Sequence, residues 1–556
     1  MLQGRAALPV LVVALGCSDS RSTGPAPIDA TEGGGITGDA TSASPDAESS
    51  SEGGVVDDSG DDGPHVKLDV GGGGGQDSGG GPTQVCDVGD ASDDVAPCHQ
   101  LAPPGSFEPD VQWSWSDEYG YTQIVVTPLV ANLDDDNGDG VVDLCDTPEI
   151  VVLAYADLLG YGHIFVLSGD DGTVEAAFEH PLDPTVTPAL ADIDGDGDIE
   201  ILAVDGKSLV DVVPGHLVAF DAQGNVEWIS DDVATPSGIG AVAIADLEAD
   251  GDVEILFANG VYDHQGALLW SRDESPSEAA SLVTAADLDG DGDLEVVHGR
   301  AAYHHDGTVY YQTTIARGFP HVADFDDDGD PEILVTNGDG LALVDHTGDV
   351  LWSAARPTGD SASSDLVWLK PGSVHDFDGD GDVEFATGSA NHYSVIDIAS
   401  EGPTVVWSAA VEDLTGSSGG TAFDFDGNGR AEAMYADETR LFVFDDSGAP
   451  LFTATRDSVT GVEYPVVADV DADGSAEIVV VSNTQTRSGA PAVMVIRDVE
   501  DRWIPARKIW NQHTYHVSNV NEDGTVPTGE VPAWQQLNTF RTNSQVEGGA
   551  ICRPEG

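Results

Sequence analysis

The chain has 556 residues, of which 101 are Asp or Glu and only 19 are Lys or Arg, so its formal net charge at pH 7 is −82. Nucleic acids and anionic membrane surfaces are poor partners for such a chain, because both favour basic patches.

The N-terminus is typical of an export signal. Arg5 supplies a positive charge, residues 6–15 are apolar, and Gly16 precedes Cys17. Ten apolar residues are too few for a membrane-spanning helix. Residues 1–17 resemble a bacterial lipoprotein signal, which implies a lipid anchor at Cys17, although Leu15 stands one position later than that pattern prefers. The resemblance predicts an outer-membrane or cell-surface protein. An ordinary secretory signal, giving a secreted or periplasmic protein, is the alternative.

Residues 18–104 are predicted to form a disordered linker. They are rich in Gly, Ser, Asp, Thr and Pro and contain almost no aromatic residues. Such a segment cannot bury enough apolar surface to offset the entropy lost on ordering. We expect a flexible tether that holds the folded part away from a membrane.

Four cysteines follow Cys17, and an even number in an exported chain permits two disulfides. They are Cys86, Cys98, Cys145 and Cys552. Proximity favours Cys86–Cys98, which would leave Cys145 to pair with Cys552, but the sequence does not fix this pairing.

An acidic nine-residue pattern recurs along the rest of the chain. In its first regular copy, D-I-D-G-D-G-D-I-E from Asp192, acids occupy positions 1, 3, 5 and 9 and Gly197 occupies position 6. Calcium takes six to eight oxygen ligands, so carboxylates at this spacing, with the backbone carbonyl of position 7, can surround one ion. Glycine at position 6 permits the sharp turn. An apolar run typical of a buried strand follows.

Seven copies keep Gly at position 6 and Glu at position 9. Their starts lie 37 to 54 residues apart, which is the period of a propeller blade. The predicted calcium ligands, position 7 included for its carbonyl, are Asp192, Asp194, Asp196, Asp198 and Glu200; Asp246, Glu248, Asp250, Asp252 and Glu254; Asp287, Asp289, Asp291, Asp293 and Glu295; Asp324, Asp326, Asp328, Asp330 and Glu332; Asp376, Asp378, Asp380, Asp382 and Glu384; Asp424, Asp426, Asn428, Arg430 and Glu432; and Asp469, Asp471, Asp473, Ser475 and Glu477.

An eighth, variant copy lies upstream, in residues 132–150. It resembles a twelve-residue EF-hand calcium loop with Asp in place of the terminal Glu. Glu149-Ile150 then mirrors Glu200-Ile201, so an equivalent strand is expected after it. The predicted ligands of this copy are Asp135, Asn137, Asp139, Asp143 and Asp146. Up to about eight calcium ions are therefore expected.

Short strands separate the loops, and no segment of helical period lies between them. One repeat shows strands at 200–204, 215–221, 224–228 and 240–245, divided by Gly, Asp and Asn turns. Four-stranded antiparallel sheets repeated radially form a β-propeller, so the predicted fold is all-β. Eight loops favour eight blades, with seven blades and one irregular repeat as the alternative. Residues 111–115 resemble the end of a blade and are a candidate for closing the ring.

These repeats resemble FG-GAP/VCBS repeats, the units of integrin-α-type propellers, over roughly residues 113–510. The resemblance implies a calcium-binding propeller at 105–510 and a C-terminal closing segment at 511–556. It specifies function weakly, because the same architecture serves adhesion proteins and some polysaccharide lyases. The chain departs from the family pattern in two ways. Position 9 is Glu in seven loops, and one loop has Asn428 and Arg430, which predict that its site is weak. Magnesium is expected less than calcium, because it keeps several waters and strict octahedral geometry.

The C-terminal residues contain an amide-rich, aromatic and basic stretch with two interpretations. It forms either a carbohydrate-facing surface or a closing segment whose polar side chains satisfy backbone groups at the propeller rim, and we favour the second. The residues concerned are Arg507, Lys508, Trp510, Asn511, Gln512, His513, Tyr515 and His516.

No nucleophile elbow, P-loop, dinucleotide fingerprint or zinc-protease motif is present in the sequence. The leading hypothesis is therefore a monomeric, non-enzymatic propeller with structural calcium that binds a glycan or a cell-surface protein. A polysaccharide lyase is the first alternative, although Lys207, Lys370 and Lys508 are the only lysines of the propeller and lie in no recognisable motif. A purely structural envelope protein is the second.

Overall fold

The computed structural model describes residues 95–554, except 118, 157–159, 207–214, 232–238, 273–281, 358–367, 390, 414–416 and 484–488. The predicted signal, Cys17, Cys86 and Lys207 lie outside the described residues.

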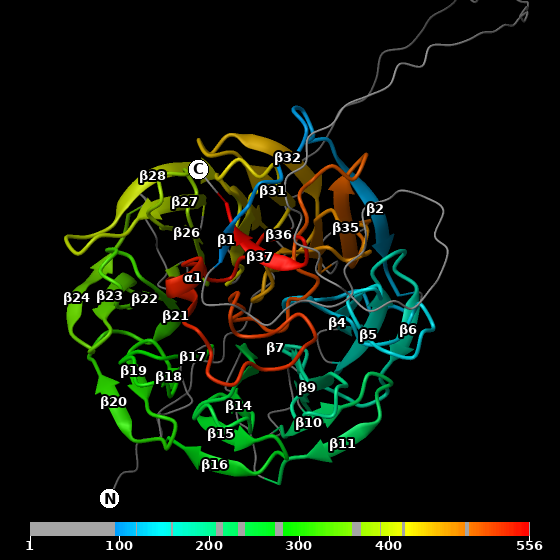
Figure 1. Ribbon diagram of the computed structural model, residues 1–556, viewed down its shortest axis with the longest axis horizontal. Coiled ribbons are helices and arrows are strands. Elements are labelled where there is room, and N and C mark those ends of the chain that lie inside the picture. The colour runs from blue at the N-terminus through cyan, green and yellow to red at the C-terminus, as the bar shows by residue number, and fades with distance from the viewer. Residues whose placement is uncertain are drawn as a thin grey trace, which may run out of the picture. The chain divides into compact units, whose positions relative to one another are not determined.

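Eight four-stranded antiparallel sheets, formed by the described residues, surround a common centre as the blades of a propeller (Figure 1). Blade 1 contains β3 (Leu129–Ala131), β4 (Glu149–Tyr155), β5 (Gly162–Ser168) and β6 (Val174–Ala177); blade 2 β8 (Ala189–Ala191), β9 (Glu200–Val204), β10 (Leu217–Phe220) and β11 (Val226–Ile229); blade 3 β13 (Ala243–Ala245), β14 (Glu254–Phe257), β15 (Gly260–Asp263) and β16 (Leu268–Ser271); blade 4 β17 (Thr284–Ala286), β18 (Glu295–Val297), β19 (Ala301–Tyr303) and β20 (Val309–Gln312); blade 5 β21 (Gly318–Ala323), β22 (Glu332–Asn337), β23 (Gly340–Asp345) and β24 (Val350–Ala355); blade 6 β25 (Ser373–His375), β26 (Glu384–Gly388), β27 (His392–Asp397) and β28 (Thr404–Ala410); blade 7 β29 (Gly420–Phe423), β30 (Glu432–Ala436), β31 (Arg440–Phe444) and β32 (Pro450–Thr455); and blade 8 β33 (Val466–Ala468), β34 (Glu477–Val481), β35 (Val493–Asp498) and β2 (Pro109–Trp115). The predictions of an all-β propeller and of eight blades are confirmed.

Burial follows the position of each strand within its blade. The second strands are buried on both faces between neighbouring blades, and β9 accordingly is a continuous apolar run after Glu200. The fourth strands lie at the outer edge and are mostly exposed or half-buried, and β16 alternates regularly between the two. Continuous apolar runs are typical of strands covered on both faces, and alternation is typical of strands with one face in water.

The predicted boundary between consecutive blades is wrong by one strand. Residues 240–245 were expected to end the blade that begins at 200, but β13 pairs with β14 in the following sheet. The short strands β7 (Val186–Thr187) and β12 (Gly240–Ala241) pair separately and link these two blades. The acidic loop between β13 and β14 joins its flanking strands as an antiparallel pair, so each loop lies inside a blade rather than between two blades.

The ring closes through blade 8, to which both ends of the propeller contribute. Strand β2 pairs antiparallel with β35, with Trp113 opposite Val495 and Trp115 opposite Val493. The predicted closing role of residues 111–115 is thus confirmed. Pairing with β2 covers the edge of β35, which would otherwise present unpaired backbone groups.

Neighbouring blades are joined by an aromatic ring packed on a glycine. Trp228, on the outer strand of blade 2, lies against Gly266 in the last turn of blade 3, and a Cβ at Gly266 would lie 2.5 Å from the indole. Gly266 also has a φ of 80°, which favours glycine. Trp270 contacts Gly307 of the next blade in the same way. Each of these contacts joins the outer strand of one blade to the last turn of the next blade.

A disulfide joins the two ends of the described chain. Cys98 is bonded to Cys552, 454 residues away, beside the parallel pair of β1 (Ala96–Pro97) and β37 (Ala550–Arg553). Strand β36 (Val546–Glu547) completes this small sheet. The predicted pairings Cys86–Cys98 and Cys145–Cys552 are wrong, and Cys145 is disulfide-bonded as well. Residues 95–104, expected to belong to the linker, include β1 and contact the propeller, because Ala102 N donates to Asp426 O.

Residues 505–545, here called the central segment, fill the middle of the ring (Figure 1). They include the one-turn helix α1 (Ala533–Gln536). Their hydrogen bonds follow the order of the blades: Trp510 with Val130 in blade 1, Asn511 with Leu190 in blade 2, Gln512 with Ile244 in blade 3, Thr514 with Val283 beside β17 in blade 4, Asn538 with Asp324 after β21 in blade 5, Phe540 with Val374 in blade 6, Arg541 with Thr421 in blade 7, and Asn543 with Val467 in blade 8. The segment pairs with inner-strand groups that would otherwise face the centre without partners.

The central segment is buried, which decides between its two interpretations. Trp510, His513 and Tyr515 have no exposed surface, and Arg507 is 2% exposed. A carbohydrate-facing surface made of these side chains is wrong. The expectation that they satisfy backbone groups is confirmed, since Arg507 donates to the carbonyls of Val517 and Val520, but they do so in the centre of the ring and not at its rim.

Candidate metal sites

The eight acidic loops occupy one face of the propeller. Each connects the first strand of a blade to the second, in blade 2 for example β8 to β9, and alternate strands run in opposite directions. All eight first-to-second connections therefore lie at the same side of the ring. The topology brings together predicted ligands that are spread over more than 300 residues of sequence, from Asp135 to Glu477.

The loops share one pattern of internal hydrogen bonds. The first-position carboxylate accepts the N–H of the position 6 glycine, as Asp192 accepts from Gly197 at 3.1 Å. The position 5 side chain accepts the N–H of position 7, as Asp196 accepts from Asp198 at 3.0 Å. The position 9 Glu accepts the N–H of position 2 through Oε2, as Glu200 does from Ile193 at 2.9 Å. The last contact leaves Oε1 of each Glu for another partner.

Carboxylate oxygens in several loops lie close enough to share a cation. One oxygen each of Asp192, Asp194 and Asp196 falls within 4.8 Å of the others, and two further such groups come from the loops of blades 4 and 5. They are Asp287, Asp289 and Asp291, and Asp324, Asp326 and Glu332. An all-oxygen donor set of this kind is the type that calcium prefers.

Buried acceptors without partners show that the loops fit a cation. Oε1 of Glu477 and Oδ1 of Asp469, both in blade 8, are buried and accept no hydrogen bond. Oε1 of Glu149 in blade 1 is likewise buried and accepts no hydrogen bond. A buried ionised oxygen without a partner is costly, and a bound cation removes that cost. The residues present therefore fit the predicted metal, with positions 1, 3, 5 and 9 as side-chain ligands.

The pKa values of the position 9 glutamates are strongly raised. Burial is the main cause, and the loop aspartates add to it, while the hydrogen bond from the position 2 N–H opposes it. The pKa is raised to about 9 in Glu149, to about 8 in Glu200, Glu254, Glu332 and Glu384, and to about 7 in Glu295, and it is also raised in Glu432 and Glu477. Without a cation, the five side chains whose pKa is about 8 or 9 are largely protonated at pH 7.

The calcium-free protein is expected to lose stability as the pH rises from about 4.5 to about 8. A carboxyl whose folded pKa lies above its unfolded value of 4.5 binds more protons in the folded state across this window, so its contribution disappears as the pH passes the folded pKa. We expect the melting temperature of calcium-depleted protein to decrease steadily as the pH rises from 5, until most of the protein is unfolded at 25 °C near neutral pH. A melting temperature that increases over this range would contradict the prediction.

Two variants separate this effect from general charge repulsion. Glu200→Gln removes one titrating group and keeps an oxygen for the Ile193 N–H, so it should flatten the pH dependence. Asp171→Asn removes a charge from an exposed turn and should leave the slope unchanged. With saturating calcium the slope should reverse, because the ion competes with protons for the same oxygens.

The variant loop of blade 1 has the expected EF-hand-like core. Asp135 accepts the N–H groups of Gly138 and Gly140, and Asn137 accepts that of Asp139. Asp146, at the twelfth position, is fully buried and accepts from the N–H groups of Asn137 and Asp143. The predicted residues thus lie in one loop. Glu149, which was not included among them, occupies the place of the position 9 Glu, because it accepts the N–H of Leu133 at 2.6 Å.

Blades 4 and 7 differ from the others. In blade 4, His304 Nδ1 lies 2.9 Å from Glu295 Oε1, and both residues have an atom within 4.8 Å of an Asp289 oxygen. Spacing along the chain gave no sign of this histidine, which reaches the loop from the turn after β19. In blade 7 the Arg430 side chain pairs with Asp446, so only its carbonyl is available to the loop. The expectation that this site is weak stays a prediction.

A cavity of about 400 Å³ adjoins three of these loops. The loops of blades 5, 6 and 7 supply Asp324, Asp376 and Asp424 to its walls. The remaining walls come largely from the central segment and include Trp534, Gln536, Asn538, Thr539, Asn543, Ser544 and Gln545. Sequence reasoning did not find this cavity, because its walls come from chain segments that meet only through the ring.

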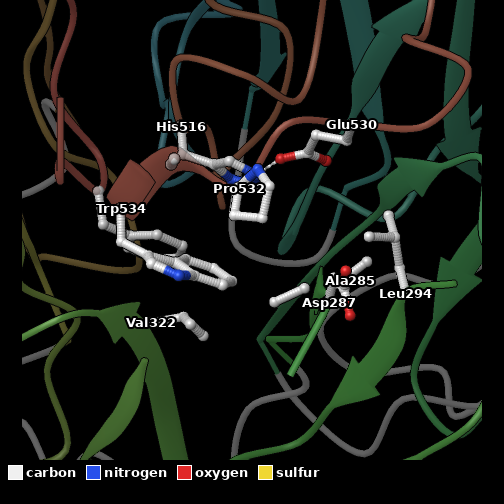
Figure 2. A pocket seen from close by; sticks show the side chains of 11 residues that line it. Ala285, Asp287, Leu294, Val322, His516, Glu530, Pro532 and Trp534 are labelled. Carbon is white, nitrogen blue, oxygen red and sulfur yellow. Dashed lines mark hydrogen bonds and ion pairs between the residues drawn. The ribbon is translucent and has the colours of Figure 1, made fainter. Parts of the chain in front are cut away.

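A second cavity, shown in Figure 2, is too small for a ligand. Its volume is about 10 Å³, enough for about one water molecule. His516 Nε2 lies 2.7 Å from Glu530 Oε1 at its edge, with Trp534 opposite Val322. Burial lowers the pKa of His516, but the Glu530 carboxylate outweighs it and raises the pKa overall. This pair joins two parts of the central segment to each other beside residues of blades 4 and 5.

No protein-family model and no curated protein sequence matches the chain. Among solved structures, the V. cholerae biofilm matrix protein Bap1 is 23% identical, with a TM-score of 0.67 over 80% of this chain and 100% of that one. Rhamnogalacturonan lyase YesW is 17% identical, with a TM-score of 0.47 over 80% and 82%. The Bacillus licheniformis rhamnogalacturonan lyase PL11 is 18% identical, with a TM-score of 0.44 over 83% and 82%. The similarity to Bap1 shows a shared fold, and membership of the FG-GAP/VCBS repeats stays a prediction.

In the described ranges of the chain, no helix has both the length and the apolar character needed to cross a bilayer.

Proposed function

We propose that this chain is an extracellular, calcium-loaded propeller that binds a hydroxyl-rich glycan in the cavity beside blades 5 to 7. The observation that carries the proposal is the polar wall of the cavity, to which Thr539, Ser544 and Gln545 contribute hydroxyl and amide side chains. Side chains of these types exchange hydrogen bonds with hydroxyl-rich ligands.

The other walls suit a sugar in different ways. Trp534 offers an aromatic surface for the apolar face of a pyranose ring, and the amides of Gln536 and Asn538 suit hydroxyl groups. The volume of about 400 Å³ lies within the range of small-molecule sites, about 300–1,000 Å³. A protein surface would not enter such a cavity, which is why a glycan is favoured over a surface protein.

Calcium has a structural role in this proposal. Ions held by positions 1, 3, 5 and 9 would neutralise the loop carboxylates and fix the loops of blades 5, 6 and 7 as cavity walls. Asp324, Asp376 and Asp424 belong both to these loops and to the cavity, so calcium and glycan binding are expected to be coupled.

An extracellular location is supported by the disulfide between Cys98 and Cys552, because such bonds form in oxidising compartments. A biofilm matrix protein has the same fold, which is compatible with this location. Attachment through a lipid on Cys17 is part of the proposal and is tested by mass spectrometry of the mature N-terminus.

The test is retention of the full chain on a panel of neutral and acidic polysaccharides in calcium. We expect retention on at least one of them, lost on chelation. Trp534→Ala and Ser544→Ala should weaken it about tenfold, a loss of about 1.4 kcal/mol. Tyr119→Ala, which removes an exposed aromatic ring outside the cavity, should retain the unsubstituted affinity. Equal retention of all variants would place the glycan elsewhere, and no retention on any polymer would contradict the glycan proposal.

A lyase is the alternative, and the same assay separates it from simple binding. His375 and Arg553 line the cavity and are its candidates for a base and an anion-stabilising group. Of the lysines considered earlier, two do not fit, since Lys370 is buried against Asp413 and Lys508 donates to the Leu144 carbonyl. Ultraviolet absorbance from unsaturated products that rises with time would establish the lyase, and its absence with retention would support the binding protein.

A further inference from the structure

Blade 1 has more carboxylates at its loop than one calcium site uses. The EF-hand-like loop takes Asp135, Asn137, Asp139 and Asp146, whose oxygens all accept N–H groups of that loop. Asp134 and Asp136, which alternate with these residues in the sequence, form a second group, and Asp136 also faces the Asp146 carboxylate. One oxygen of each lies within 4.8 Å of the other and of a Glu149 oxygen.

Glu149 supplies the observation that separates a cation site from an ordinary acidic surface. Its side chain is fully buried. Oε2 accepts the Leu133 N–H and Oε1 has no hydrogen-bond partner, and one oxygen of this carboxylate lies in the group formed with Asp134 and Asp136. The exposed Glu175 on β6 adds a further negative charge nearby. Burying an acceptor among like charges is unfavourable unless a cation binds there.

The same residues also occupy the frame used in the other blades. Glu149 holds the position 2 N–H as Glu200 does, so Leu133 is position 2 and Asp134 is position 3 of that frame. The insertion between Asp136 and Glu149 then provides a second, separate loop. Asp134 and Asp136 belong to the group that contains Glu149. Asp135, which lies between them in the sequence, accepts an N–H of the insertion loop, so the carboxylates form two groups of ligands.

We propose that blade 1 binds two hard divalent cations, one in the insertion loop and one between Asp134, Asp136 and Glu149. This inference rests on the proposed calcium loading of the propeller and adds one ion to it. Both sites have oxygen ligands only, so calcium is the expected ion at each. One ion would bind within the insertion, and the other would bind where the insertion begins and ends. Blade 1 lies next to blade 8, in which the ring closes.

The test is calcium content per chain, measured by atomic emission on the full chain after saturation and gel filtration. Asp134→Asn with Glu149→Gln should lose about one ion, and the amide introduced by Glu149→Gln keeps an oxygen for the Leu133 N–H. Asp135→Asn with Asp139→Asn should also lose about one, and the four substitutions together about two. Asp171→Asn, an exposed residue of the same blade, should lose none.

Each outcome supports or overturns the inference. If the fourfold variant loses only one ion, the two groups share a single cation and the proposal is wrong. It is equally wrong if Asp134→Asn with Glu149→Gln loses none. Crystals of the unsubstituted protein soaked in a lanthanide should show two anomalous peaks in blade 1, and this holds even if a variant fails to fold. One peak there, with peaks in other blades, would overturn this inference alone, whereas no peak in any loop would overturn the calcium loading as well.

Discussion

Removal of calcium from the full chain at neutral pH is expected to unfold most of it at 25 °C. A site whose free ligand is at one hundred times its Kd stabilises the folded state by about 2.7 kcal/mol. Eight such sites contribute on the order of 20 kcal/mol, which exceeds the total stability of about 5–15 kcal/mol typical of folded proteins. The acidic loops also repel one another once their ions are gone, since the formal charge is −82.

The measurement is a thermal melt with and without chelator, followed by circular dichroism, with metal content determined on both samples. Chelator mixed with excess calcium is the control and should restore the unfolding transition. Excess magnesium should restore it only in part, because magnesium keeps several of its waters. An unchanged melting temperature in verified metal-free protein would show that the loops do not stabilise the fold through calcium.

Trp510→Ala is expected to destabilise the whole propeller by about 3–5 kcal/mol, the usual cost of emptying a buried tryptophan site. Trp510 has no exposed surface, stacks on Tyr515 with ring centres 4.5 Å apart, and belongs to the core cluster that joins blades 8, 1 and 2. Its backbone exchanges two hydrogen bonds with Val130 on the inner strand of blade 1. The loss should therefore reach several blades and not the central segment alone.

Chemical denaturation in the presence of calcium measures this loss of stability, and hydrogen exchange shows which strands are destabilised. Tyr119→Ala is the matched control, because that ring is 81% exposed and its loss should change stability by less than about 0.5 kcal/mol. Faster exchange at inner strands of several blades would support the central segment as the common core of the ring. A variant that melts like the unsubstituted protein would mean that the ring is stable without it.

The central segment also explains where a ligand can bind. A ring of eight blades leaves room at its centre, and in many binding folds such a space is the natural site. Here the space is occupied by buried side chains, among them Arg541, whose pKa is lowered to about 10 chiefly by burial. The proposed ligand site therefore lies at the edge of the segment, where Trp534 and Ser544 meet the loops of blades 5 to 7.

The sequence by itself determined the repeating parts of this protein. The spacing of Asp192, Asp194, Asp196 and Glu200 is local, and the loop it specifies closes within nine residues through its own backbone N–H groups. Apolar runs after each loop specify buried strands for the same local reason. Repetition then determined the propeller and its eight blades, and the pattern of residues 111–115 indicated the closing strand.

Only the tertiary structure decided the features that depend on distant segments meeting. The Cys98–Cys552 disulfide spans 454 residues, and sequence proximity favoured the wrong partner. The sequence pattern is the same whether β13 ends one blade or begins the next, so only its pairing with β14 assigned it to blade 3. The path of residues 505–545 through all eight inner strands, and the cavity at its edge, exist only once the ring has closed, because unpaired backbone groups of every blade then face one centre. Local spacing specifies each loop, whereas closure of the ring specifies what the loops surround.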